Sequence, residues 1–169
     1  MIRFEHVARA AAAAIVALLM AAPPAAAQDR LRTVQTAQTA TPPAGEKKQH
    51  RLILQVNTND PAMMNLALNN AANVVQYYKE TGEKVEVEIV TFGPGLHMLR
   101  DDTSPVKARI KTMAQTMPAV SFKACGNTQA NMGKAEEKEI PIIPEATIVK
   151  SGVVRVMELQ EQGWSYVRP

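Results

Sequence analysis

From residue 51 onward, the apolar positions of the chain predict strands in several separate segments. RLILQVN (51–57) is a short, nearly continuous apolar run, which is typical of a strand buried on both faces of a parallel sheet. KVEVEIVTF (84–92) alternates apolar residues with Glu86 and Glu88, which predicts a strand with one polar face. Such a face fits an edge strand or a face covered by another subunit. Three shorter strands are predicted over AVSFKA (119–124), ATIV (146–149) and WSYVR (164–168).

Between the strands, apolar residues recur at steps of three and four, the spacing of one helix face. After Asp60, which suits an N-cap, such a face runs from Met64 to Tyr78 and stops near Gly82. Three further helices are predicted, over 106–117, 127–139 and 151–163. In the last of these the valine run favours a strand, but the length, the opening serine and the closing glycine favour a helix.

The alternation of strands and helices predicts an α/β fold, with a parallel sheet covered by helices on both faces. Ligands of such sheets bind at the carboxyl ends of the strands. Three loops of unusual composition leave those ends: NTND, TFGPGLH and CGNT. Because these loops would share one edge of the sheet, we expect Cys125 to lie near Asn59, Gly93, Gly95 and His97.

The first 49 residues differ in character from the rest. Residues 1–27 combine two arginines, a short apolar run and a closing Ala-Ala-Ala, the pattern of a secretory signal peptide cleaved near Ala27. The alternative is an uncleaved anchor, but the apolar run is short for a membrane span. Residues 28–49 are rich in Gln, Thr, Ala and Pro and predict a disordered spacer. The domain then covers 50–169, in a protein exported to a bacterial periplasm without stable membrane insertion after cleavage.

Charge and motifs exclude several functional classes. The formal net charge of +3 is small, and no basic stripe is interleaved with aromatic residues, so we expect no nucleic-acid partner. The sequence contains no G-x-S-x-G, H-E-x-x-H, dinucleotide fingerprint or C-x-x-C, which disfavours hydrolases, metalloproteases and thioredoxin-type oxidoreductases. One cysteine and three histidines are too few for a zinc site, and the nine methionines fit core packing better than Cu(I) binding. We expect no metal and no cofactor.

Cys125 is the only cysteine, so it cannot form an internal disulfide. It lies between a predicted strand end and a helix capped by Asn127 or Thr128, where outward-pointing backbone amides stabilise a thiolate and lower its pKa. Gly126 is expected to leave the sulfur uncovered, while Asn127 and Thr128 can donate hydrogen bonds to it. The alternative is a buried structural cysteine, and the residue pattern alone leaves both interpretations open.

Supporting roles can be assigned to neighbouring loops. Gly93 and Gly95 flank a proline and suit an anion-accepting turn, although a tight strand-to-helix connection explains them equally simply. His97 is a candidate acid, base or charge partner of the thiol, and its alternative is a partly exposed loop histidine. Asn59 completes the group as a further ligand-binding candidate.

Four segments resemble the DsrE/DsrF-like sulfur-relay family: HRLILQVNTNDPAMMNLALNNAANVVQYY, VEIVTFGPGLHMLRDDTSPV, VSFKACGNT and IVKSGVVRVMELQEQGWSYVRP. The likeness runs from about His50 to Pro169 and is most specific in TFGPGL, in F-x-A-C-x-N-T and in the C-terminal motif. It implies a three-layer α/β/α sandwich with a mostly parallel sheet of about five strands, and homo-oligomers, commonly trimers or hexamers.

Relay members of that family carry a cysteine at the position of Cys125, which receives sulfane sulfur as a persulfide and passes it to a partner protein. These members act in the cytoplasm, whereas this chain resembles an exported one, so the sulfur donor and acceptor stay open. The resemblance thus implies a persulfide carrier with sulfurtransferase-like chemistry rather than a turnover enzyme. The alternative is a non-catalytic oligomeric module that binds a small ligand or a partner, with Cys125 structural.

Overall fold

The computed structural model describes residues 48–169. The predicted signal peptide, its cleavage near Ala27 and the spacer up to residue 47 lie outside the described residues. The first strand, β1 (Gln49–Val56), starts two residues earlier than its apolar run. The polar Gln49 and His50 belong to it because they pair in register with Lys84 and Val85 of the neighbouring strand.

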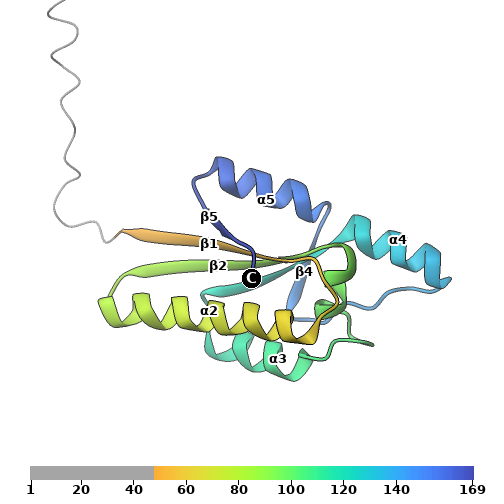
Figure 1. Cartoon of the computed structure of the whole chain (residues 1–169), viewed down its shortest axis with the longest axis horizontal. Coiled ribbons are helices and arrows are strands. Elements are labelled where there is room, and N and C mark those ends of the chain that lie inside the picture. Colours follow the sequence, from red (N-terminus) through yellow and green to blue (C-terminus); the bar gives the residue numbers. More distant parts are fainter. Residues whose placement is uncertain (1–47) are drawn as a thin grey trace, which may run out of the picture. The chain divides into compact units, whose positions relative to one another are not determined.

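Five strands form one sheet, and every neighbouring pair in it is parallel (Figure 1). The order across the sheet is β4-β3-β2-β1-β5. The other four strands are β2 (Lys84–Thr91), β3 (Val120–Cys125), β4 (Ala146–Val149) and β5 (Ser165–Val167). The predicted α/β class and the parallel sheet are therefore confirmed. β2 lies in the centre of the sheet, so the edge-strand interpretation of its alternating sequence is wrong.

Helices cover both faces of this sheet, which gives three layers (Figure 1). The helical segments are α2 (Pro61–Thr81), the 3₁₀ helix η2 (Gly93–Leu99), α3 (Lys107–Thr116), α4 (Gly126–Glu136) and α5 (Gly152–Glu161). α2 and α3 lie on one face and α5 lies on the other. No helix within residues 48–169 is long and apolar enough to cross a membrane.

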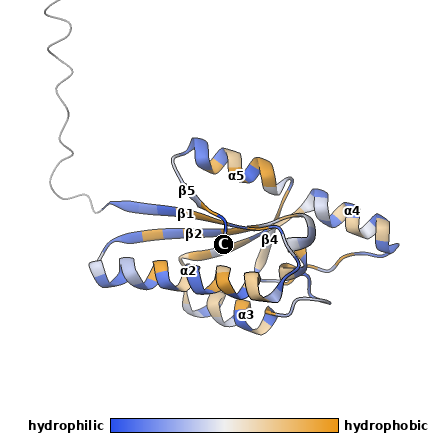
Figure 2. Ribbon diagram, viewed as in Figure 1, coloured by the Kyte–Doolittle hydropathy of each residue, from blue (hydrophilic) through white to orange (hydrophobic). Residues whose placement is uncertain are grey.

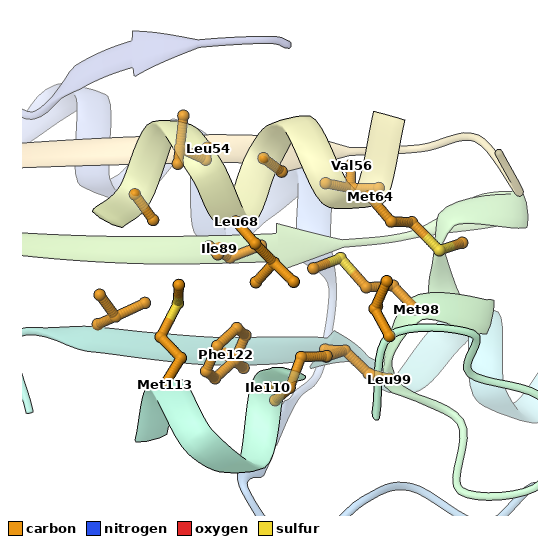
Figure 3. Close-up of a cluster of buried hydrophobic side chains, with 14 of the residues drawn as sticks. Leu54, Val56, Met64, Leu68, Ile89, Met98, Leu99, Ile110, Met113 and Phe122 are labelled. Carbon is orange, nitrogen blue, oxygen red and sulfur yellow. The ribbon is translucent and has the colours of Figure 1, made fainter. Parts of the chain in front are cut away.

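The larger core lies between the sheet and the pair α2 and α3 (Figure 3). Leu54, Ile89 and Phe122 of three adjacent strands face Leu68 of α2 and Ile110 of α3, and all five side chains are buried. The opposite face has a smaller apolar cluster under α5, made of Ile53, Val90, Val156 and Leu159. Since adjacent residues of β1 fall into different clusters, the strand is buried on both faces, as its continuous apolar run predicts.

Helix boundaries follow the expected local chemistry. The Asp60 carboxylate accepts a hydrogen bond from the Ala62 amide at 2.8 Å, and Gly82 ends α2 with a left-handed φ of 70°. Ser151 caps α5, which confirms the helical interpretation of the valine run. The helix prevails over the β propensity of those valines because Val156 and Leu159, on its inner face, are buried against the sheet.

Glu88, one of the two acidic residues on the polar side of β2, is covered by the chain's own helix α5. Glu88 is only 4% exposed, and its carboxylate accepts two hydrogen bonds from the Arg155 guanidinium, at 2.7 and 2.9 Å. This bidentate pair neutralises a carboxylate that would otherwise be costly to bury. An internal ion pair therefore explains the position of Glu88, whereas Glu86 of the same strand is exposed.

Candidate thiol site

The loops after β1, β2 and β3 meet at the carboxyl ends of the parallel strands. The Gly93 amide donates a hydrogen bond to the Thr128 hydroxyl oxygen at 3.0 Å, which joins the loop after β2 to the start of α4. Gly95 presses against the end of β1, since a Cβ placed on it would lie 2.2 Å from the Val56 carbonyl oxygen and 2.8 Å from the Asn57 Cα. The structure thus brings these three predicted loops together, with the loop after β2 in contact with both of the others.

Cys125 is both the last residue of β3 and the N-cap of α4, which begins at Gly126. The predicted caps, Asn127 and Thr128, instead lie within the first turn. The helix starts earlier because it follows the strand directly, with the Asn127 amide donating to the Lys150 carbonyl at 3.1 Å. The early start places the first-turn amides beside the cysteine sulfur.

Hydrogen-bond donors from two helices lie around the sulfur of Cys125. Burial works to raise the pKa of the thiol, but donation from the Thr128 hydroxyl and from the backbone amides of Gly152 and Thr128 outweighs it, so the pKa is lowered. Gly152 is the first residue of α5, whereas Thr128 belongs to α4. The amino-terminal ends of two different helices therefore converge on one sulfur atom, which favours its anionic form.

Gly152 allows this convergence. A Cβ on Gly152 would lie 3.2 Å from the Cys125 Cβ and 2.9 Å from the Phe92 Cδ1, so a larger residue would push α5 away from the thiol. Sequence reasoning did not identify Gly152. The sequence does show that a helix starts shortly after the strand over 146–149. To place that helix start beside Cys125, however, one must know that this strand pairs with β3.

The Thr128 hydroxyl is oriented by its second partner. Its oxygen already accepts from the Gly93 amide, so its own proton is free to be donated to the sulfur of Cys125. The hydroxyl therefore acts as a fixed donor and not as a free rotor. Gly93 has a φ of 53°, a left-handed conformation that a glycine adopts without steric cost.

Replacing Thr128 by valine should make Cys125 less reactive. The loss of one hydrogen bond to a charged group should slow alkylation of the folded thiol near neutral pH by about tenfold. Iodoacetamide labelling followed by intact mass, measured across a range of pH, would report the change. Thr128→Ser keeps the hydroxyl and should react like the wild type; equal slowing by both substitutions would contradict the role of the hydroxyl.

Two of the predicted site residues do not contact the thiol. The His97 Nδ1 lies 2.8 Å from the Thr103 hydroxyl oxygen, and no hydrogen bond or ion pair joins His97 to Cys125 within residues 48–169. Asn59 is exposed, and it is Asn57 that approaches the loop at Gly95. Over the same range, no cluster of three or more His, Cys, Asp or Glu side chains is placed to hold a metal ion.

The expectation that Gly126 leaves the sulfur uncovered is wrong. Cys125 is only 4% exposed. A Cβ on Gly126 would lie 3.2 Å from both the Ile148 side chain and the Val149 carbonyl oxygen. Gly126 therefore allows α4 to start close against β4, and this close packing helps to bury the thiol instead of exposing it.

A buried arginine fixes the far end of α4. Arg100, 1% exposed, donates hydrogen bonds to both oxygens of Asp102 and to both oxygens of Glu136, which lies in the last turn of α4. Lys138 adds ion pairs to the same two carboxylates, at 3.0 and 3.2 Å. This network joins α4 to the segment that follows η2, and so supports the helix that presents its amides to Cys125.

No family model and no curated protein sequence matches the chain. A solved structure does: the "Protein of Unknown Function MTH1491 from Methanobacterium thermoautotrophicum". It is 26% identical and superimposes with a TM-score of 0.60 over 71% of this chain and 99% of its own. The likeness supports the α/β fold, and because that protein is described as of unknown function, it supplies no activity.

Proposed function

We propose that this protein is an exported, DsrE-like sulfur carrier in which Cys125 holds sulfane sulfur as a persulfide. The observation that carries the proposal is the convergence of the α4 and α5 amides and the Thr128 hydroxyl on a single thiol. Donors of this kind stabilise a thiolate, which is the form of cysteine that attacks sulfur. In a persulfide, the negative charge lies on the outer sulfur, one S–S bond of about 2 Å beyond the atom that these donors address.

The chemistry requires no cofactor and no oxidant. The Cys125 thiolate attacks the sulfane sulfur of a donor R–S–SH, so that one S–S bond forms and one breaks. The products are Cys125–S–SH and the thiolate R–S⁻, which takes a proton from water. Proton loss from the new persulfide then leaves the negative charge on its outer sulfur, which is the atom to be transferred. A thiolate on an acceptor takes the outer sulfur by the same exchange.

Intact mass spectrometry tests the proposal. Purified domain incubated with inorganic polysulfide should gain the mass of one or more sulfur atoms, and a reductant should remove them. The Cys125→Ser variant should gain none. If wild-type protein gains no sulfur under conditions that load a known persulfide carrier, the proposed function is wrong.

The exposed fraction of Cys125 favours a second candidate function. At 4% exposure, the thiol also fits a structural residue of a non-catalytic module that binds a small ligand or a partner. Thiol titration of the folded protein separates the two candidates. A Cys125 that reacts no faster than the same residue in the unfolded chain, together with unchanged ligand binding by Cys125→Ala, would support the binding module.

We further propose that the carrier is a homo-oligomer. Several apolar side chains at the edge of the molecule are about half exposed, which is unusual for large apolar residues gathered on neighbouring elements. Figure 2 shows hydrophobic positions towards the amino-terminal end of α5. The side chains concerned are Ile148 of β4 and Val153 and Met157 of α5. A second copy of the chain would cover them, and sedimentation analysis would measure the resulting oligomer.

A further inference from the structure

A groove of about 550 Å³ opens beside the thiol. It is lined by Asn127, Val149, Lys150, Ser151, Val154, Arg155 and Glu158. Two of these residues lie close to Cys125 along the chain or across the fold: Asn127 follows it by two residues, and Ser151 directly precedes Gly152, on which an added Cβ would lie 3.2 Å from the Cys125 Cβ. One end of the groove therefore lies near Cys125, although Cys125 itself does not line it. Its volume falls in the range of about 300–1,000 Å³ that is usual for small organic ligands.

The charges along the groove are arranged as a dipole. Arg155 is bound by both oxygens of Glu88, so its charge is already balanced. Lys150, which is exposed, lies at the thiol end beside Ser151. Glu158, also exposed, follows Ser151 by two helical turns, about 10 Å further along α5. Val149 and Val154 add an apolar lining to the same groove.

We propose that this groove binds the organic part of a small zwitterionic persulfide of the peptide type. The inference rests on the proposed function. A carboxylate near the persulfide group would pair with Lys150, and an ammonium at the other end would pair with Glu158. The sulfane sulfur then lies at the Cys125 thiolate, which attacks it and releases the peptide as its thiolate. An inorganic polysulfide has no ammonium for Glu158 and no apolar part for the valines.

The pairing with Glu158 can be tested with two matched donors. Glutathione hydropersulfide carries an ammonium, and its N-acetylated derivative has the same persulfide and carboxylates without that charge. In Glu158→Gln, the second-order rate of Cys125 loading from glutathione hydropersulfide should fall by about two- to fivefold, the range of an exposed ion pair. The rate from the acetylated donor and from inorganic tetrasulfide should not fall.

Glu161→Gln is the matched control, because Glu161 is also an exposed residue of α5 but does not line the groove. It removes the same charge from the protein and should leave the preference between the two donors unchanged. Lys150→Met should slow loading from both organic donors, and Lys134→Met, an exposed site on α4 outside the groove, should not.

Binding can be measured apart from transfer. In Cys125→Ser, reduced glutathione should shift the amide NMR signals of Asn127 and Ser151, and the additional change Glu158→Gln should weaken that response. The inference is overturned if Glu158→Gln changes the loading rate equally for all donors, or for none of them. In that case, loading of Cys125 by polysulfide would still support the carrier function. Failure of every donor to load wild-type Cys125 would reject both.

Discussion

Gly95→Ala should destabilise the domain by about 3 kcal/mol or more. A methyl group on Gly95 would lie 2.2 Å from the Val56 carbonyl oxygen and 2.5 Å from the carbonyl carbon, and both are backbone atoms that cannot rotate away. To relieve the clash, the loop after β2 must separate from the end of β1. Urea unfolding followed by circular dichroism would measure the loss as a lower midpoint at an unchanged slope.

Gly93→Ala is the control for this substitution, since the two glycines lie in the same loop. No atom lies within 4 Å of a Cβ placed on Gly93, and only its φ of 53° disfavours alanine. The expected loss is about 1–2 kcal/mol, the usual penalty of the left-handed conformation. A Gly95→Ala protein as stable as Gly93→Ala would show that the close approach of the loop to β1 is not maintained in solution.

Arg100→Met should reduce stability by about 3 kcal/mol, near the lower end of the range for breaking a buried ion pair. The loss stays near that end because Asp102 and Glu136 are each about one-third exposed and keep Lys138 as a partner. Methionine fills much of the volume left by the arginine. The substitution should also slow labelling of Cys125, because the far end of α4 loses its anchor. Thermal unfolding and iodoacetamide labelling measure the two effects separately.

The same network makes stability depend on acid. Hydrogen bonds from Arg100 lower the pKa of Glu136 to about 2, and they lower that of Asp102 even further. The folded protein thus binds fewer protons than the unfolded chain, whose carboxyl groups titrate near 3.8 and 4.5. The stabilisation is complete above about pH 5 and is lost as the pH falls towards 2. Arg100→Met should lose less stability over this interval, and parallel pH profiles for the two proteins would refute the assignment.

Local signals in the sequence were sufficient to predict the elements of the fold. The Asp60 cap, the Gly82 stop and the spacing of apolar residues in α2 each depend on contacts within a few residues. The meeting of the three loops at the carboxyl ends of the strands followed from parallel pairing alone. These predictions succeeded because each required only local geometry or the direction of the strands.

Predictions that depended on strand order were less successful. Glu88 looked like an exposed or intersubunit residue because its partner, Arg155, lies 67 positions away on a helix whose place in the sheet was unknown. Gly152 was missed for the same reason. Gly126 is predicted from the sequence to leave the Cys125 sulfur uncovered, but it packs against β4, again a distant segment. Pairing between remote segments leaves no periodic signal in a single sequence.

The contribution of Gly152 has a consequence for when the thiol becomes reactive. β3 and α4 follow each other directly in the chain, but the Gly152 amide lies near the sulfur only when β4 is paired with β3, since that pairing sets Val149 beside Cys125. A molecule in which β4 and the start of α5 have detached from β3 keeps a thiol with fewer donors. The acidity of Cys125 therefore reports whether this edge of the sheet is in place.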